Sequence, residues 1–450
     1  MIKNKKYLII VLIIYLFTGC SFDSKTGIWS GDEKEKQKIA ELEKEQNQKI
    51  NVEKAYSSEN IYLREITAVK KVILNQPTKN LDWKMSGLNL QNFMGNSYLS
   101  STSNNFLKKK IGKNKFSNSK VMASPIVINN NILLTDDTGT IFYISRSGEL
   151  HWKKNIYKKI NKKISKNLSL SVYKNKIYIA DNIGFIYSID LNTSKLIWIK
   201  NHGIPIKSKI KVFDNKIFVI NQDNRIICFE TENGSKIWDV RSVSSFIKSQ
   251  GYLALAITKE GDLLTINSSG DLTKFEINYG RIYWSLNVTS SLFAHDKDFF
   301  ESSDVVLDDD KIIFSTISSI FSYDLTNGYL NWKVDLNSTN TPIIVKDNIF
   351  LVSNSGYFIN LNRSSGEIVW STNILKILKR KKQKTEVTGF ILGSGKVYAT
   401  TLNGYLIVCS ASSGKVESFK KIGNSIVADP IISDGSLYIL TENSKLFGFN

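Results

Sequence analysis

Short apolar segments separated by turn residues recur along most of this chain. In each copy an Asp- or Asn-rich turn precedes an alternating apolar run, a second turn follows, and an aromatic residue closes the unit. Alternation at every second position, with many Ile, Val, Phe and Tyr residues, predicts β-strands rather than helices. Seven copies are visible, at 136–154, 181–200, 221–240, 267–286, 315–334, 353–372 and 401–421. Such self-similarity indicates a repeat architecture.

Each repeat predicts four short strands joined by hairpin turns. In the first repeat these are 123–130, 132–136, 140–145 and 149–155. Glycine recurs at the second and third turns, where hairpins often require a positive φ that glycine adopts without steric cost. Four antiparallel strands per unit, repeated with little helix, are typical of propeller blades. The predicted fold class is therefore all-β, an eight-bladed β-propeller.

Seven blades are complete in the sequence, and the eighth is shared between the two ends of the propeller region. The C-terminal residues supply three strands, 426–433, 437–442 and 445–450, and we expect the strand around Trp83 to supply the fourth. Closure of this kind removes exposed sheet edges. The recurring aromatic residues are expected to pack between blades as core; they are Trp83, Trp152, Trp198, Trp238, Trp284, Trp332, Trp370 and Phe419.

The first residues resemble a bacterial lipoprotein signal. Lysines at 3, 5 and 6 precede an apolar run, 7–17, that is too short to span a bilayer. Thr18-Gly19-Cys20 then resembles a lipobox, in which Cys20 would become the lipidated first mature residue. Ser21 at the next position favours the outer membrane. We therefore expect a signal peptide at 1–19, a charged, partly helical or disordered tether at 20–78, and the propeller at 79–450.

Charge and cysteine content narrow the function classes. The formal net charge is +19, yet Lys, Asn and Ile are abundant throughout and no nucleic-acid module is visible, so we expect no nucleic-acid partner. Cys228 and Cys409 fall on opposite sides of an eight-membered ring, too far apart for a disulfide, and are expected to be buried apolar residues. No metal-type cysteine spacing is present.

The repeat unit resembles the PQQ-type propeller repeat, as in 364–370 (SSGEIVW) and 232–238 (ENGSKIW). Eight such blades behind a lipobox resemble the BamB family of outer-membrane assembly lipoproteins. The resemblance implies a scaffold without catalysis and without a cofactor. It also implies a lipid-anchored protein on the periplasmic face of the outer membrane. Its implied partners are the barrel-forming subunit, BamA, and nascent outer-membrane proteins.

Two other functions stay open at this point. PQQ-dependent dehydrogenases share the repeat, but they need a calcium site and an Asp base. They also often use a pair of adjacent cysteines, and this sequence contains no such pair. A periplasmic scaffold or ligand-binding propeller unrelated to barrel assembly is the other alternative.

Strand parity predicts where a partner binds. In a four-stranded blade, the second turn and the connection to the next blade share one face, and the first and third turns share the other. The long, irregular segments are all connections between blades, so they lie on one rim, where loops commonly carry function. Within the family resemblance, the docking residues correspond to Phe246, Ile247 and Lys248 before blade four, with Asp298 and Glu301 before blade five.

Overall fold

The computed structural model describes residues 21–22, 29–30, 64–67, 72–113, 115–116, 123–241, 252–289, 300–378, 385–426 and 428–450. The chain divides into two units, Met1–Ile61 and Tyr62–Asn450. In the first unit, β1 (Ser21–Phe22) pairs antiparallel with β2 (Trp29–Ser30). The predicted boundaries of signal, tether and propeller stay predictions.

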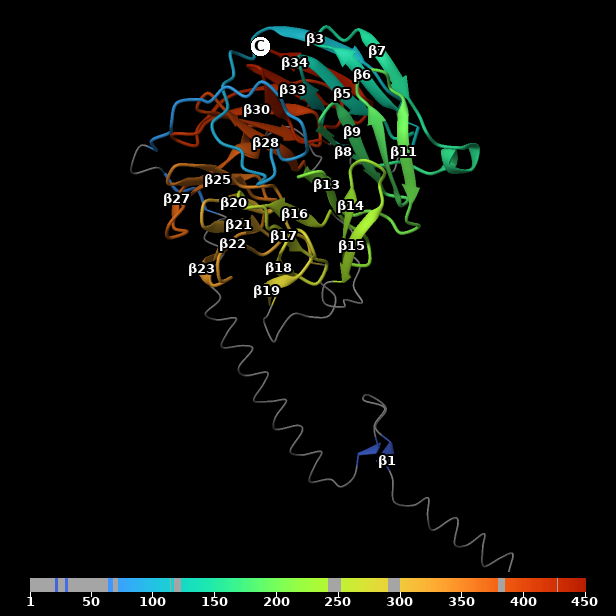
Figure 1. Cartoon of the computed structure of the whole chain (residues 1–450). Coiled ribbons are helices and arrows are strands. Elements are labelled where there is room, and N and C mark those ends of the chain that lie inside the picture. The colour runs from blue at the N-terminus through green and yellow to red at the C-terminus, as the bar shows by residue number, and fades with distance from the viewer. Residues whose placement is uncertain are drawn as a thin grey trace, which may run out of the picture. The chain divides into compact units, whose positions relative to one another are not determined.

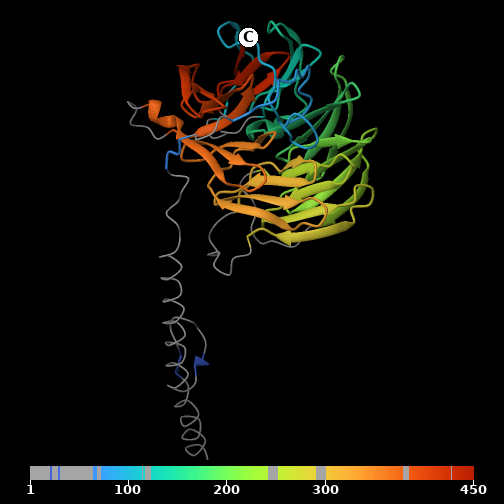
Figure 2. The ribbon, with the colours of Figure 1, turned by 90° about the vertical axis from the view of Figure 1, so that its left-hand side faces the viewer.

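The second unit is a ring of eight four-stranded antiparallel sheets, which confirms the predicted propeller (Figures 1 and 2). Blade one consists of β4 (Ile126–Ile128), β5 (Asn131–Thr135), β6 (Ile141–Ser145) and β7 (Leu150–Lys154), and blade two consists of β8 (Leu168–Tyr173), β9 (Lys176–Asp181), β10 (Phe185–Asp190) and β11 (Leu196–Asn201). Blade three consists of β12 (Lys211–Phe213), β13 (Lys216–Ile220), β14 (Arg225–Glu230) and β15 (Lys236–Arg241), and blade four consists of β16 (Ala254–Ile257), β17 (Leu263–Ile266), β18 (Asp271–Phe275) and β19 (Ile282–Asn287).

Blades five to eight continue the same order around the ring. Blade five consists of β20 (Val306–Asp308), β21 (Lys311–Ser315), β22 (Ser319–Asp324) and β23 (Leu330–Asp335), and blade six consists of β24 (Ile343–Val345), β25 (Asn348–Val352), β26 (Tyr357–Asn362) and β27 (Ile368–Asn373). Blade seven consists of β28 (Val387–Gly393), β29 (Lys396–Thr401), β30 (Tyr405–Ser410) and β31 (Val416–Lys421), and blade eight consists of β32 (Ile431–Ser433), β33 (Ser436–Leu440) and β34 (Lys445–Phe449), with β3 (Asn105–Lys110). Two short 3-10 helices, η2 (Lys159–Lys163) and η3 (Ile374–Leu378), follow β7 and β27.

Burial follows the position of each strand in its blade. The second and third strands, such as β25 and β26, are buried along nearly their whole length because neighbouring blades cover both faces. The fourth strands are largely exposed, as β7 and β31 show. The first strands contact one another from blade to blade, as β8, β12, β16 and β20 do, so they line the axis of the ring. Cys228 and Cys409 are free and buried, as predicted.

In five blades the tryptophan of the outer strand packs against the third-turn glycine of the following blade. A Cβ atom at Gly414 would lie 2.6 Å from the Trp370 ring, and one at Gly366 would lie 2.7 Å from Trp332. The same contact joins Trp198 to Gly234, Trp238 to Gly280, and Trp284 to Gly328. These glycines have φ between 70 and 75°, a region that suits glycine. The prediction that the tryptophans are core is confirmed for Trp238, Trp332 and Trp370, which are buried, whereas Trp198 and Trp284 are half-buried.

Hydrogen bonds strengthen several of these contacts. The indole Nε1 of Trp332 donates to the carbonyl of Arg363 at 3.1 Å, and that of Trp238 donates to Ile277 at 3.0 Å. The register of the outer pair also shifts beside each tryptophan, for example between Asn360 and Leu361, which face Trp370 and Ile368. A β-bulge at this point re-aims a side chain toward a neighbour.

The prediction that the Trp83 strand completes the eighth blade is wrong. The fourth strand of that sheet is β3, which pairs antiparallel with β34. Leu107 of β3, 3% exposed, takes the place of the tryptophan, and a Cβ atom at Gly148 of blade one would lie 2.9 Å from it. Lys109 Nζ also donates to the Gly148 carbonyl at 2.8 Å. The N-terminal side of the propeller region does close the ring, but through a later segment than the aromatic pattern indicated.

The seventh blade, which carries Phe419, faces a neighbour that lacks the third turn. Blade eight joins β34 to β3 through pairing rather than through a hairpin, so no third-turn glycine lies opposite Phe419. The Phe419 side chain is 45% exposed, whereas Trp370 in the preceding blade is fully buried. The one aromatic substitution in the repeat therefore coincides with the seam of the ring.

Trp83 belongs instead to a segment that runs around the inside of the ring, residues 78–99, here called the axial segment. Trp83 exchanges backbone hydrogen bonds with Val127 of β4, at 2.7 and 3.1 Å. Further on, Val172 N of blade two donates to the Lys84 carbonyl, and Ile257 N of blade four donates to the Leu90 carbonyl, both at 2.9 Å.

The axial segment next contacts blade five and then blade seven. Leu307 N donates to the Gln91 carbonyl at 3.0 Å, and Ser97 N donates to the Leu392 carbonyl at 3.2 Å. Asn92 is fully buried, and its amide donates to two backbone carbonyls, those of Leu255 and Val305. The segment thus supplies partners for inner-strand backbone groups that would otherwise face the axis.

Lys211 of β12 fixes the axial segment. Its side chain is fully buried, and Nζ donates to the carbonyls of Ser86 at 2.9 Å and Asn89 at 2.7 Å, and to Asn92 Oδ1 at 2.6 Å. Three acceptors match the three N–H groups of an ammonium. Burial lowers the pKa of Lys211 to about 7, opposed by the carboxylate of Asp304. Gly87 makes room for this arrangement, because a Cβ atom there would lie 2.2 Å from Asn92 Oδ1.

The substitution Gly414→Ala tests the contact between tryptophan and glycine. Its methyl group must displace the Trp370 ring while the backbone keeps a left-handed conformation, so we expect the free energy of unfolding to fall by about 2–5 kcal/mol. The matched control is Gly203→Ala, which has a similar φ of 68° but no atom within 4 Å of the added carbon, and should cost about 1–2 kcal/mol. Urea unfolding followed by tryptophan fluorescence measures both, and equal losses would contradict the packing argument.

The substitution Lys211→Met tests the attachment of the axial segment. It leaves three buried acceptors without their donor, so we expect the free energy of unfolding to fall by about 2–5 kcal/mol and cleavage within 78–99 by added protease to accelerate. Lys259→Met is the control, because that ion pair with Asp309 is exposed and its loss should leave the free energy of unfolding nearly unchanged. If the two variants unfold alike and resist protease alike, the axial segment does not depend on Lys211.

Candidate functional site: a central cavity

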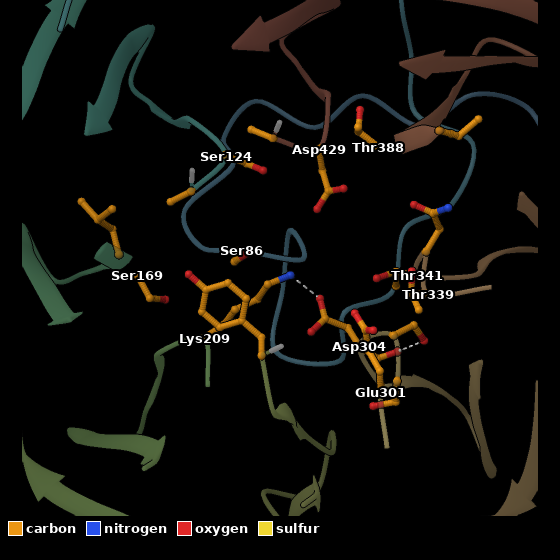
Figure 3. Close-up of a pocket in the computed structure, with 18 of the residues that line it drawn as sticks. Ser86, Ser124, Ser169, Lys209, Glu301, Asp304, Thr339, Thr341, Thr388 and Asp429 are labelled. Atoms are coloured by element: carbon orange, nitrogen blue, oxygen red, sulfur yellow. Dashed lines mark hydrogen bonds and ion pairs between the residues drawn. The ribbon is translucent and has the colours of Figure 1, made fainter. Parts of the chain in front are cut away.

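A cavity of about 390 Å³ lies on the axis of the propeller (Figure 3). Its walls come from residues that immediately precede the first strands of the blades, such as Lys209, Asp304 and Asp429. These positions belong to the connections between blades, so the cavity lies toward the face that carries those connections. Ser86 of the axial segment also contributes to the lining. The axial segment is the blue trace that crosses behind the labelled side chains in Figure 3.

The charged lining of the cavity is mainly acidic. Lys209 is the one basic residue among the described lining residues, against the carboxyl groups of Glu301, Asp304, Glu386 and Asp429. Hydroxyl groups fill much of the remaining wall, from Ser124, Ser169, Ser302, Ser303, Thr339, Thr341 and Thr388. The cavity therefore offers hydrogen-bond acceptors and negative charge in a chain whose formal net charge is +19.

Lys209 and Asp304 form a close ion pair across neighbouring parts of the wall. Lys209 Nζ lies 2.6 Å from Asp304 Oδ2, and the Asp304 side chain is 9% exposed. Burial alone would lower the pKa of Lys209, but the carboxylates of Asp304 and Asp429 outweigh it and hold the pKa above its ordinary value. Lys209 is therefore a fixed cation whose charge is neutralised mainly by Asp304.

Asp429 has a different environment. Its carboxylate points into the open centre in Figure 3, and no hydrogen bond or ion pair of that side chain occurs within the described part of the chain. The side chain is accessible from the cavity but lies deep inside the ring, and this burial raises the pKa of Asp429 even though Lys209 opposes the shift. Gly389 leaves space for the carboxylate, because a Cβ atom at 389 would lie 2.4 Å from Asp429 Oδ1.

The structure places only one of the predicted docking residues. Glu301 is exposed and lines the cavity close to the ion pair (Figure 3). Phe246, Ile247, Lys248 and Asp298 lie outside the described residues, as does the predicted lipidation site Cys20. Segment 242–251 follows β15 and precedes β16, so it is a connection between blades three and four. The roles of these residues stay predictions.

Sequence reasoning missed the cavity, although a signal for it existed. In blades one, three, five, six and eight, a cavity-lining residue stands two positions before the first strand; these residues are Ser124, Lys209, Asp304, Thr341 and Asp429. Because first strands line the axis, this position faces a common centre. Reading that single position across the repeats shows charged residues in blades three, five and eight.

Two general features of the described residues bear on function. In the described ranges, no group of three or more His, Cys, Asp or Glu side chains could hold a metal ion. None of the helices found there has the length and apolar character needed to cross a membrane.

Comparisons with known proteins agree with the fold. The family model described as outer membrane protein assembly factor BamB matches residues 137–372, just over half of the chain. A curated relative of that name from Legionella pneumophila (strain Paris) is 23% identical over 41% of this chain, and the match spans 47%, about half, of that relative's own length. Another from Shewanella oneidensis is 21% identical over 67% of this chain and 77% of the relative.

Solved structures share the same architecture. BamB from Moraxella catarrhalis superposes with a TM-score of 0.62 at 12% identity, covering 76% of this chain and all of that chain. A europium-containing methanol dehydrogenase superposes with a TM-score of 0.64 at 13% identity, covering 80% of this chain and 89% of that chain. At these identities the structural likeness establishes the propeller fold alone. The family model, by its extent, identifies this chain as a member of the family of outer membrane protein assembly factor BamB.

Proposed function

We propose that this protein is a non-catalytic docking lipoprotein of the machinery that assembles outer-membrane β-barrel proteins. It binds the periplasmic part of the barrel-forming subunit, a BamA-like protein, and aids the insertion of nascent outer-membrane proteins. Lipid on Cys20 anchors it to the outer membrane, facing the periplasm. The observation that carries the proposal is the match of residues 137–372 to the BamB family model.

The geometry of the ring supports a docking role. Contacts between each tryptophan and the next blade make the strands a continuous, well-packed body. The irregular connections between blades are gathered on one rim of that body, where they can present side chains without disturbing the core. Phe246, Ile247 and Lys248 form the proposed apolar and basic contact, and Asp298 and Glu301 form the proposed acidic contact one blade later. Glu301 is exposed beside the cavity mouth, as such a contact requires.

The charge of the cavity argues against a quinone cofactor of the dehydrogenase type. Pyrroloquinoline quinone is a carboxylated anion, and the described lining presents four carboxyl groups to it. Lys209 is already engaged by Asp304 at 2.6 Å, so it offers no free counter-charge. The residues present therefore do not fit that cofactor.

A paired substitution on the connection rim tests the docking role. The variant Phe246→Ala with Lys248→Glu removes the apolar contact and reverses the charge, so recovery of the barrel-forming subunit from solubilised membranes should fall about ten-fold or more. The control is Tyr329→Ala with Lys195→Glu, which makes the same two kinds of change in exposed third turns on the opposite face. Undiminished recovery with the rim variant would overturn the docking assignment.

A reconstitution experiment tests the absence of catalysis. Purified protein incubated with pyrroloquinoline quinone and calcium should show neither bound-quinone absorbance nor alcohol-dependent dye reduction, because the acidic lining repels the anionic cofactor. A quinoprotein alcohol dehydrogenase treated in parallel confirms that the reagents are active. Stoichiometric quinone uptake with dye reduction would establish an enzyme instead.

A further inference from the structure

We propose that the central cavity is a binding site for an organic cation, a primary ammonium or guanidinium group, with Asp429 as its principal contact. This goes beyond the docking function, because it concerns the axis of the ring and a ligand rather than the rim and the assembly subunit. The volume of about 390 Å³ lies within the range of about 300–1,000 Å³ that small-molecule sites occupy.

The charge balance of the cavity favours a cation. Of the four carboxyl groups in the described lining, that of Asp304 is satisfied by Lys209. Glu301, Glu386 and Asp429 remain as exposed negative groups around one cavity. The chain as a whole has 60 basic and 41 acidic residues, so this concentration of acid runs against its composition. Low-dielectric walls around charges of one sign focus their field and concentrate ions of the opposite sign.

Asp429 is the carboxyl group best placed to bind a ligand. Its side chain is exposed to the cavity and points into the open centre, so a ligand can reach the carboxylate directly. No partner for this side chain occurs among the described residues, although Lys209 is close enough to oppose the rise in the Asp429 pKa. The chain also keeps Gly389 where any larger residue would meet the carboxylate. The arrangement preserves an unpaired acceptor that projects into the cavity.

The form of the site selects an organic cation over a metal ion. The described carboxyl groups do not gather into a set that could hold a metal. They are spread around the wall among hydroxyl groups such as Ser124, Thr341 and Thr388, which accept hydrogen bonds from N–H donors. Tyr252 adds an aromatic residue to the lining, and aromatic faces attract ammonium and guanidinium groups.

Two sources can supply this chemistry, a free polyamine or a Lys or Arg side chain of a polypeptide. The test is isothermal titration of the full-length protein in detergent with three probes: spermidine, acetyl-Ala-Arg-Ala-amide and acetyl-Ala-Glu-Ala-amide. We expect saturable binding of one or both cationic probes at one site per chain and none of the acidic peptide. Binding of spermidine indicates a free polyamine, whereas binding of the basic peptide alone indicates a polypeptide side chain.

The substitution Asp429→Asn assigns the site. It keeps the shape of the side chain but removes the charge, so the dissociation constant for the cationic probe should rise about ten-fold or more. Glu149→Gln is the matched control, since Glu149 is exposed in a third turn on the opposite face and its loss should leave binding unchanged. Because the net charge of +19 disfavours adventitious cations on the surface, a single saturable site is diagnostic.

Folding is separated from binding in the same samples. Asp429→Asn removes the charge of an exposed side chain that makes no described hydrogen bond or ion pair, and it leaves Lys209 paired with Asp304, so the melting temperature should stay close to that of the wild type. No binding of either cationic probe to the wild type, equal affinity in Asp429→Asn, or binding of calcium in place of organic cations would each overturn the proposal. None of these outcomes alters the co-purification test, which depends on Phe246 and Lys248.

Discussion

The fold depends on one contact that repeats around the ring, the tryptophan of one blade against the third-turn glycine of the next. Each blade alone exposes both faces of its central strands, so stability requires that neighbours be held together. The indole ring buries a large apolar area against a backbone that only glycine can bring so close, with φ near 70° in the pairs described. Every other feature, including the closed axis and the gathered connections, presupposes this register between blades.

The same contact explains how far the sequence could be interpreted. Strand number, blade order and the buried aromatic set followed from period-two alternation and recurrent Gly and Trp, which are local signals. The strand that closes blade eight was misassigned because Trp83 matches the aromatic residue of the repeat but lies in the axial segment, paired with Val127. Leu107 performs that role on β3, and a single leucine in a lysine-rich strand has no distinctive pattern. Pairing between β3 and β34 is a long-range event that alternation alone does not specify.

The site was less predictable than the fold for a related physical reason. The cavity is formed by single residues from many blades, far apart in the chain and brought together only when the ring closes. Lys209 and Asp304 are almost a hundred positions apart in sequence, yet their charged atoms lie 2.6 Å apart. The floor comes from the axial segment, whose attachment rests on one buried lysine, Lys211, and on backbone carbonyls that carry no sequence signature.

Closure of the axis and chemistry of the cavity are therefore linked. A propeller whose first strands line an open channel leaves polar backbone groups and side chains along a water-filled path. Here the axial segment satisfies many of those backbone groups, and its Ser86 contributes to the wall of the cavity. Lys211 is buried against the axial segment and is bound by three neutral oxygens, whereas in the cavity wall Lys209 is bound by a carboxylate and Asp429 by no described group. The ring scaffold is common to propellers of many functions. In five blades of this chain the residue two positions before the first strand lines the cavity, and these residues are Ser124, Lys209, Asp304, Thr341 and Asp429.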